Sequence, residues 1–513
     1  MRIFKFPFAL CVALFAQILF SSPAQAKWLR GETQNFVIFS SGDDKQLREY
    51  GATLERFNAL IRANFGITTT PSPNKLIIYF LQDPTDVDRL LTGRQGIIAG
   101  FYSTDNEGSY AVANRHKAES VLDLSGMTVL LHEYTHHFMF RNFTYAYPAW
   151  YVEGFAEYFS TTEFKPDGNW ALGKVAQHRA YGLRSETRLT IQRILTGDSS
   201  KLNDEEFELF YGRSWLLVHM LNSKPEYKGK LTAYFAALRS GKTELEAAHE
   251  VFGDLRLLDR ALDTYRDGKL TYHVSAQPIA ADTAMSVSEL DPVSGQMVML
   301  HLQRINHRNT DKTRKDLRAL AIAQPHRADI WYELALSETD LPKEAPPAAV
   351  DLATKRAEAA IDAALVADPH HARANVFKAY LLMNRLKAAG TTTAASWNKA
   401  RGYLVTANSS AVDDPLVLVA WYDSYALQGR PPTKIAHEAL ARAFDLEPEI
   451  TEVRTKYALD LAQQGDYETA IRLVEFLAQD PHNPDPGKAL LAQLNAMKAA
   501  AVKAAQAPTS AGH

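Results

Sequence analysis

The residues most suited to chemistry lie in two short segments, 132–136 and 150–157. The first segment has the pattern His-Glu-x-x-His. On a helix, residues four apart share one face, so His132 and His136 can both reach one metal ion. Glu133 lies about 100° around that helix from His132, beside the metal face, where it can accept a proton from water. These residue types and their spacing are typical of a zinc-dependent hydrolase.

The second segment supplies two carboxylates on one side of another helix. Glu153 and Glu157 are four residues apart. We interpret Glu153 as the third metal ligand, because two histidines and one glutamate form a standard catalytic zinc set that leaves the fourth position to water. Glu157 is then expected outside the ligand set, where it accepts an N–H from a ligand histidine and orients its ring. Gly154 is expected where this helix lies close to the histidine-bearing helix.

Further residues predict where these two helices begin. Ser125 is a good N-cap for the first helix, and Pro148 suits the first turn of the second. His137 lies off the ligand face, and we expect it to pack or to form a hydrogen bond instead of binding metal. The alternative interpretation is that segment 132–136 is an ordinary surface helix with a chance match to the pattern.

The two segments resemble a known group of enzymes. His-Glu-Tyr-Thr-His-His, followed by Pro-Ala-Trp-Tyr-Val-Glu-Gly-Phe-Ala-Glu-Tyr-Phe, is similar to the gluzincin branch of metallopeptidases. It resembles more closely a bacterial peptidase-MA-like family that is often joined to tetratricopeptide repeats. The resemblance implies Zn²⁺ bound by His132, His136 and Glu153, with Glu133 as the catalytic base. In better-known gluzincins the position of Glu157 is often Asp.

One more segment shares the resemblance and suggests a residue that stabilises the transition state. This segment is Phe-Tyr-Gly-Arg-Ser-Trp at 210–215. A hydrolase of this kind needs a group that stabilises the oxyanion of the transition state. Tyr211 is our candidate, because the resemblance reaches it. His178, Tyr181 and His219 are alternatives, and each of the four is also compatible with a purely structural role.

The N-terminus predicts export. Residues 1–26 have a basic start, an apolar run and the cleavage pattern Ala-Gln-Ala, as expected for a secretory signal peptide. The alternative is a membrane anchor, but the apolar run of about 15 residues is short for a span. Cleavage would give a periplasmic or secreted chain without a membrane span and without Cys11, the only cysteine. It would also change the net charge from −3 to −5, which is too mild to indicate nucleic-acid binding.

Residues 27–275 are expected to form a zincin-like metallopeptidase domain of the α+β class. Its first part, 27–120, alternates strand and helix signals, and its second part, 121–275, is mostly helical and carries the site. We expect strands at 35–40 and 75–80, a helix at 43–65, and a hairpin formed by 100–102 and 109–113. The strand just before the histidine-bearing helix in sequence, 109–113, suits either a substrate-binding edge, to which an extended peptide adds, or ordinary sheet pairing.

The rest of the chain is expected to be an α-helical repeat solenoid. Residues 276–315 show no clear period and are expected to connect two domains. Residues 316–505 are rich in alanine, and the last two of their recurring prolines, at 448 and 481, are spaced like tetratricopeptide repeats, which have a period of about 34 residues. Such repeats would fold alone and bind a protein partner on their concave surface. A generic helical bundle is the alternative, and 506–513 are expected to be a disordered tail.

Together, these features predict an exported zinc metallopeptidase that acts on a peptide or protein substrate, with a repeat domain for protein recognition. The alternative from another class is an adaptor protein built on repeats, with an inactive or structural metal domain. Glu133 favours the enzyme, because a structural zinc site needs four protein ligands and no base. A zinc hydrolase of non-peptide amides or esters would use the same residues.

Overall fold

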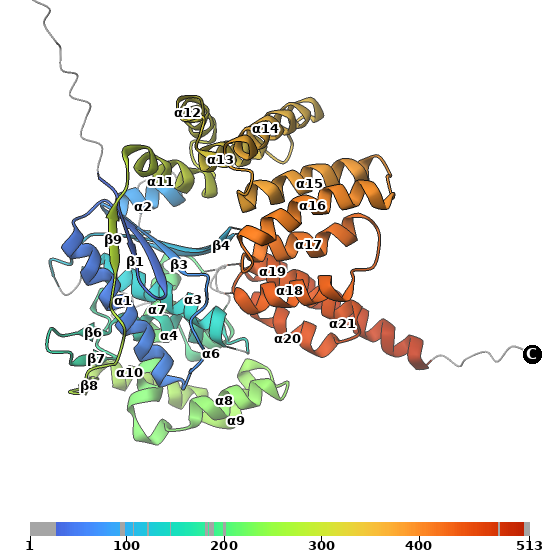
Figure 1. The fold of residues 1–513 in the computed structure, drawn as a ribbon. Coiled ribbons are helices and arrows are strands. Elements are labelled where there is room, and N and C mark those ends of the chain that lie inside the picture. Colours follow the sequence, from blue (N-terminus) through green and yellow to red (C-terminus); the bar gives the residue numbers. More distant parts are fainter. Residues whose placement is uncertain are drawn as a thin grey trace, which may run out of the picture.

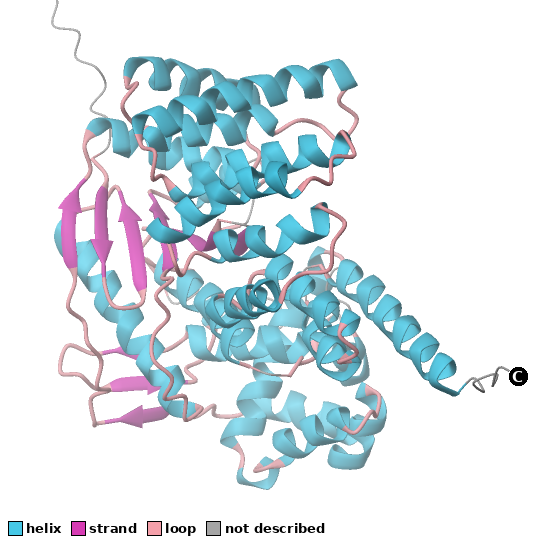
Figure 2. Cartoon of the chain, turned by 45° about the vertical axis from the view of Figure 1, so that its right-hand side comes forward, coloured by secondary structure: helices cyan, strands magenta, loops and turns pink. Residues whose placement is uncertain are grey.

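The computed structural model describes residues 27–92, 98–105, 107–120, 123–143, 145–179, 183, 189–197, 202–480 and 483–506. The expected signal peptide, Tyr181 and residues 507–513 of the expected tail lie outside the described residues. The described chain is an α+β protein with a small mixed sheet and mostly helices (Figures 1 and 2). In the ranges just given, no helix is both long and apolar enough to span a bilayer.

The main sheet has six strands in the order β4-β5-β3-β2-β1-β9. The pairs β2–β3 and β3–β5 are parallel, and the pairs toward both edges are antiparallel. The region 276–315, which we expected to connect two domains, contributes the edge strand β9 and the helix α11. The strands are β1 (Leu29–Glu32), β2 (Phe36–Ser40), β3 (Leu76–Leu81), β4 (Phe101–Asp105), β5 (Gly108–Asn114) and β9 (Ser286–Glu289).

The sequence patterns explain the centre of this sheet. β3 is buried over nearly its whole length, as expected for a parallel strand with both faces covered. The helix α1 (Asp44–Asn64) begins where the Asp43 side chain accepts the N–H of Gln46. The predicted strands at 35–40 and 75–80 and the predicted helix at 43–65 are confirmed. The hairpin is longer than expected, because its strands extend through most of the polar turn. Its second strand, β5, is paired on both sides, so the expected edge at 109–113 is wrong, the alternative of ordinary sheet pairing is confirmed, and the edge strand is β4.

Helices cover both faces of the sheet. On one face, Phe36, Ile78 and Ala111 pack with side chains of α1 and α3 (Gly126–Asn142) in the largest apolar core. On the other face, the core is formed with α2 (Pro84–Leu91) and α11 (Pro292–Ile305). The helix α11 therefore belongs to the packing of the sheet, although α12 and the helices after it follow directly in sequence.

The helices from α4 to α10 form the lower part of the molecule in Figure 1, beside a small sheet of order β6-β7-β8. They surround α4 and α7, which carry Glu153 and Tyr211. These elements are α4 (Ala149–Ser160), β6 (Glu163–Phe164), β7 (Trp170–Leu172), η1 (Gln177–Arg179), α6 (Ile191–Thr196), α7 (Asp204–Ser223), η3 (Pro225–Tyr227), α8 (Lys230–Arg239), α9 (Glu244–Phe252), α10 (Leu255–Asp267) and β8 (His273–Ser275).

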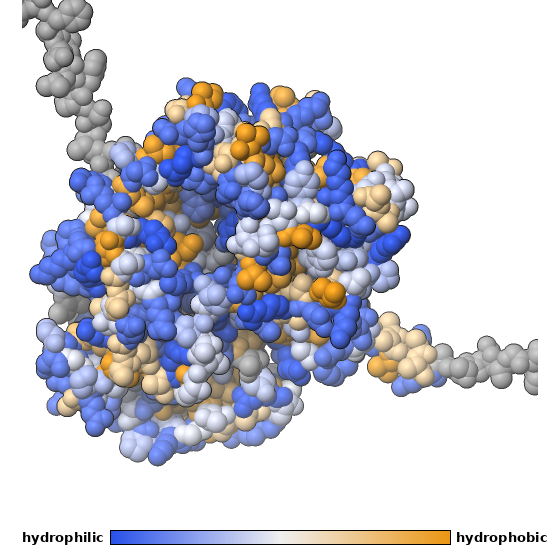
Figure 3. Space-filling view, in the orientation of Figure 1, coloured by the Kyte–Doolittle hydropathy of each residue, from blue (hydrophilic) through white to orange (hydrophobic). Residues whose placement is uncertain are grey.

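From α12 onward the chain forms stacked helix pairs that lie along one side of the sheet-bearing part (Figures 1 and 2). The face of the molecule seen in Figure 3 is mainly hydrophilic, with small and separate apolar patches. The helices are α12 (Thr310–Ala323), α13 (Ala328–Thr339), α14 (Pro347–Ala367), α15 (Ala372–Ala388), α16 (Ala394–Ser410), α17 (Pro415–Leu427), α18 (Lys434–Leu446), α19 (Thr451–Gln463), α20 (Tyr467–Ala478) and α21 (Pro484–Gln506).

Candidate metal centre

The helices α3 and α4 bring the three predicted ligands together. Nε2 of His132 and Nε2 of His136 lie 3.0 Å apart. Oε2 of Glu153 lies 3.4 Å from the first of these nitrogens and 3.5 Å from the second. All three residues are largely or fully buried, and Glu153 has no exposed side-chain surface. The three side chains form a group that could hold a metal ion.

The spacing of the donor atoms fits one small ion. Ligand atoms at zinc-like bond lengths of about 2.0–2.1 Å in a tetrahedron are about 3.4 Å from one another. The three observed separations, 3.0, 3.4 and 3.5 Å, are close to that edge length. Two neutral imidazole nitrogens and a carboxylate oxygen are also a common donor set for a divalent ion. The residues present therefore fit a bound metal ion.

Close packing fixes the two helices that carry the ligands. The start of α3 is capped by the Ser125 side chain, which accepts the N–H of Thr128, as predicted. We expected Gly154 to lie against α3, and this prediction is wrong. A Cβ on this glycine would lie 2.4 Å from the carbonyl oxygen of Ser214 in α7. Pro148 stands just before α4 and not inside its first turn. Thus α7 packs directly against α4 at the residue next to Glu153.

Glu157 lies outside the ligand group, next to a ligand histidine, as predicted from the sequence. Its Oε1 is 3.4 Å from Nδ1 of His132, the ring nitrogen that faces away from the ligand group. It also accepts a 2.9 Å hydrogen bond from Nε of Arg179, and its Oε2 lies 2.9 Å from Nε2 of His178. Burial alone would raise the pKa of Glu157, but the charge of Arg179 and these hydrogen bonds hold it well below its usual range. Glu157 is therefore held by Arg179 and His178 beside the His132 ring.

The charges around the ligand group act strongly on His132. Burial alone would lower the pKa of its ring, but the hydrogen bond to Glu153 and the charges of Glu157 and Glu133 raise this pKa to about 9. Three carboxylates thus surround one imidazole. A divalent cation bound at this point would neutralise much of that negative charge, which is a second reason why the site suits a metal ion.

Glu133 is held by the edge strand of the sheet. The backbone N–H of Tyr102, in β4, donates a 3.0 Å hydrogen bond to Oε2 of Glu133. The carboxylate is therefore fixed from the side of the sheet, while its helix also carries His132 and His136. This arrangement leaves the other carboxylate oxygen to act as a proton acceptor beside the ligand group.

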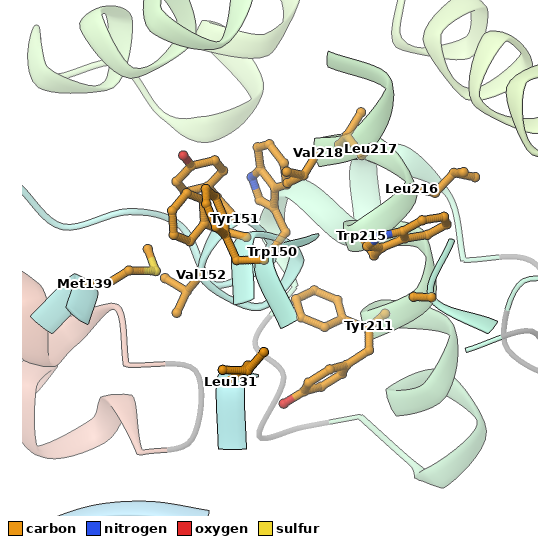
Figure 4. Close-up of a cluster of buried hydrophobic side chains, with 14 of the residues drawn as sticks. Leu131, Met139, Trp150, Tyr151, Val152, Tyr211, Trp215, Leu216, Leu217 and Val218 are labelled. Carbon is orange, nitrogen blue, oxygen red and sulfur yellow. The ribbon is translucent and has the colours of Figure 1, made fainter. Parts of the chain in front are cut away.

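Tyr211 lies against the ligand group, as expected. Its ring stacks on the His132 ring with centroids 6.2 Å apart, and the guanidinium of Arg179 lies 4.8 Å from its centroid. Figure 4 shows Tyr211 near Leu131, the residue before His132, among buried apolar side chains. Burial, with the charge of Glu153, raises the pKa of the Tyr211 hydroxyl well above its usual value, so this group remains a hydrogen-bond donor.

The other histidines have different environments. His137 packs against Tyr102, with Nδ1 3.2 Å from the tyrosine hydroxyl, in agreement with the hydrogen-bonding role that we expected. His219 is buried between the carbonyl of Gly173 and the hydroxyl of Tyr265, at 2.8 and 2.7 Å, and so has a structural environment. His178 binds Glu157. The sequence did not indicate Arg179 or Tyr102, since neither lies in a recognisable motif.

Neither the models of known protein families nor the curated proteins match this chain. The interpretation of the site therefore depends on its own residues and their geometry.

Proposed function

We propose that this chain is an exported zinc-dependent metallopeptidase with a zincin-like catalytic part of the gluzincin type and tetratricopeptide-like repeats. The observation that carries the proposal is the ligand group His132, His136 and Glu153 with Glu133 fixed beside it. The group found among the described residues contains three side chains, so a tetrahedral ion would keep one position for water. That open position and the adjacent base are what distinguish a catalytic zinc site from a structural one.

The roles of the residues follow from their positions. A bound zinc ion would polarise a carbonyl group and lower the pKa of a water molecule. Glu133 would take the proton of the attacking water and pass it to the leaving amine. Tyr211, a buried hydroxyl donor stacked on His132, would stabilise the oxyanion. Glu157 would keep the His132 ring in the orientation that presents Nε2 to the metal.

The position of β4 as the outermost strand, beside the ligand group, favours a peptide substrate. Because the Tyr102 N–H points out of the sheet toward Glu133, alternation along the strand directs the backbone of Thr104 to the same edge. An extended peptide can pair with such an edge through its own backbone groups, which would bring its carbonyl beside the ligand group. A small ester or a non-peptide amide would gain nothing from that edge.

The test measures metal content and cleavage in the mature protein and in Glu133→Gln. We expect about one zinc in both proteins, and turnover of a peptide library that falls about 10²–10⁴-fold in the variant, because the shape is kept and the base is lost. Glu226→Gln, a change at an exposed glutamate of η3, is the matched control and should retain full activity.

Three results would contradict the proposal. Equal turnover in Glu133→Gln and wild type would remove Glu133 from the role of base. Cleavage of esters without cleavage of peptides would make the protein a different zinc hydrolase. Zinc binding without any hydrolysis by the wild type would favour the adaptor protein with an inactive metal domain.

A further inference from the structure

The β4–β5 hairpin reaches from the sheet into the array of helical repeats. Glu107, at its turn, binds Arg304 of α11. The hydroxyl of Tyr332 in α13 donates a 3.2 Å hydrogen bond to the same carboxylate. Arg373 of α15 donates a 2.8 Å hydrogen bond to the backbone carbonyl of Glu107. The helix α11 and two helices of the array, α13 and α15, therefore hold the tip of this hairpin.

A second contact holds the middle of the hairpin. Glu449 precedes α19, and only 2% of its side chain is exposed. Its carboxylate accepts hydrogen bonds of 2.8 and 3.0 Å from Nη1 of Arg141, at the end of α3. The hydroxyl of Ser109 in β5 lies 3.3 Å from the same carboxylate, and Nδ1 of His137 lies 3.8 Å from it. One carboxylate from the repeats thus joins the metal helix to the hairpin.

Tyr102 connects this cluster to Glu133, the proposed general base. Its hydroxyl lies 3.2 Å from Nδ1 of His137 and 3.4 Å from the hydroxyl of Ser109, both of which are neighbours of Glu449. Its backbone N–H donates to Glu133. The side chain of this residue is therefore held by the Glu449 cluster, while its backbone holds the proton acceptor.

Hydrogen bonds donated in both directions join the C-terminal end of α3, the helix that carries His132 and His136, to the repeats. Arg141 of α3 donates a 2.7 Å hydrogen bond to the carbonyl of Leu446 at the end of α18. Arg454 of α19 donates a 3.0 Å hydrogen bond to the carbonyl of Phe140 in the last turn of α3. Hydrogen bonds from charged donors are strong, so they hold α3 firmly against the α18–α19 pair.

We infer that Glu449, a residue of the repeats, is a positioning residue of the metal site: it fixes β4 against α3 and so sets the direction of the Glu133 carboxylate. The inference rests on the proposed function, in which Glu133 is the base. The repeats would then have a second role besides protein recognition, because the catalytic part alone lacks the carboxylate that joins the β4–β5 hairpin to α3.

The experiment compares full-length wild type with Glu449→Gln, Glu449→Asp and Ser109→Ala. Amide hydrogen exchange over 101–105 reports whether the Tyr102 N–H remains bonded to Glu133, and steady-state kinetics separate kcat from KM. Glu133→Ala provides the exchange rate of an unbonded Tyr102 amide. The matched control is Glu438→Gln, an exposed glutamate of α18 that contacts Lys434.

We expect Glu449→Gln to bind zinc as wild type does, because it touches none of the ligands. Its Tyr102 amide should exchange about tenfold faster, toward the rate in Glu133→Ala. Its kcat should fall about 10- to 100-fold with little change in KM, since a displacement of about 1 Å in the reacting groups has effects of this size. Glu449→Asp should recover part of the loss, Ser109→Ala should show a smaller one, and Glu438→Gln should match wild type.

Unchanged Tyr102 exchange in Glu449→Gln would overturn the inference. A loss of zinc together with faster exchange along all of α3 would also overturn it, because Glu449 would then only support the fold. If Glu449→Gln does not fold, Ser109→Ala decides by the same two measurements. A wild type that hydrolyses no peptide refutes the proposed function, whereas the exchange result still decides whether Glu449 positions Glu133.

Discussion

Replacing Gly154 by alanine tests whether the contact between α4 and α7 sets the position of Glu153. An added Cβ would lie 2.4 Å from the carbonyl oxygen of Ser214 and 2.9 Å from Cγ2 of Val218. Non-bonded atoms normally stay about 3.5 Å apart, so the two helices would have to separate by roughly 1 Å. The Ser214 oxygen belongs to the backbone of a helix, and it cannot move aside as a flexible side chain would.

Two effects of opposite sign decide the stability of Gly154→Ala. Alanine stabilises a helix interior by about 1 kcal/mol relative to glycine. Overpacking typically costs about 1–3 kcal/mol, and here it acts on backbone and side chain together. We therefore expect the free energy of unfolding to fall by about 1–2 kcal/mol, measured by urea unfolding with tryptophan fluorescence. Because Glu153 is the adjacent residue, zinc affinity measured by chelator competition should fall at least about tenfold.

Gly402→Ala is the matched control for this substitution. Gly402 lies inside α16, and an added Cβ there would have no heavy atom within 4 Å. The free energy of unfolding of this variant should rise by up to about 1 kcal/mol, because only helix propensity changes, and its zinc affinity should stay the same. If Gly154→Ala is as stable as Gly402→Ala and binds zinc as tightly as wild type, the α4–α7 contact does not set the position of Glu153.

Three other predictions concern the ligands, their support and the boundary with the repeats. The double variant His132→Ala, His136→Ala should contain no stoichiometric zinc in elemental analysis, because two of three donors are gone, and full zinc content would disprove the assignment. Glu157→Ala should bind zinc about 10- to 100-fold more weakly in chelator competition, since the His132 ring loses its anion, and equal affinity would show that this anion does not tune the ligand. Glu447 should make stability depend on pH, because burial and then the charge of Glu449 raise its pKa from 4.5 to about 8. The folded state keeps this proton up to about pH 8 while the unfolded state releases it near pH 4.5, so the stabilisation is complete below pH 4.5 and is lost as pH rises to about 8. At about 1.4 kcal/mol per pKa unit, the free energy of unfolding should fall by at most about 5 kcal/mol over this pH range. Glu447→Gln should lack this pH dependence in urea unfolding at several pH values. If stability changes with pH in the same way in the variant and in wild type, Glu447 is not the group responsible.

The parts of the structure that local patterns determine could be predicted from the sequence. The spacing of His132 and His136 places both on one helix face whatever surrounds that helix, and Ser125 caps it as a local hydrogen-bonding residue. The central strands have continuous or alternating burial, so their sequence carries a clear period. Glu157 could be placed behind the ligands, because it is four residues from Glu153.

The parts that depend on distant segments could not be predicted. The strand β9 is only half-buried at one position and exposed at the others, so its sequence has no alternation that marks a strand. Gly154 marks a close approach between helices, but a glycine does not identify the helix that approaches it. Arg141 and Glu449 are 308 residues apart, and each resembles an ordinary surface charge until the fold buries it.

The pairing of β1 with β9 has a consequence for the order of folding. Leu29 of β1 pairs with Glu289 of β9, about 260 residues later in the chain. Contacts between such distant segments form slowly, because the intervening chain must first be ordered. The β4–β5 hairpin is local, and the β2–β3 pair lies within the first part of the chain, so both can form early. The edge strand β9 and the α18–α19 contact with α3 need later parts of the chain. A growing chain would therefore complete the helix α3 long before that helix acquires its final neighbours, and the ligand group would reach its final geometry only near the end of synthesis.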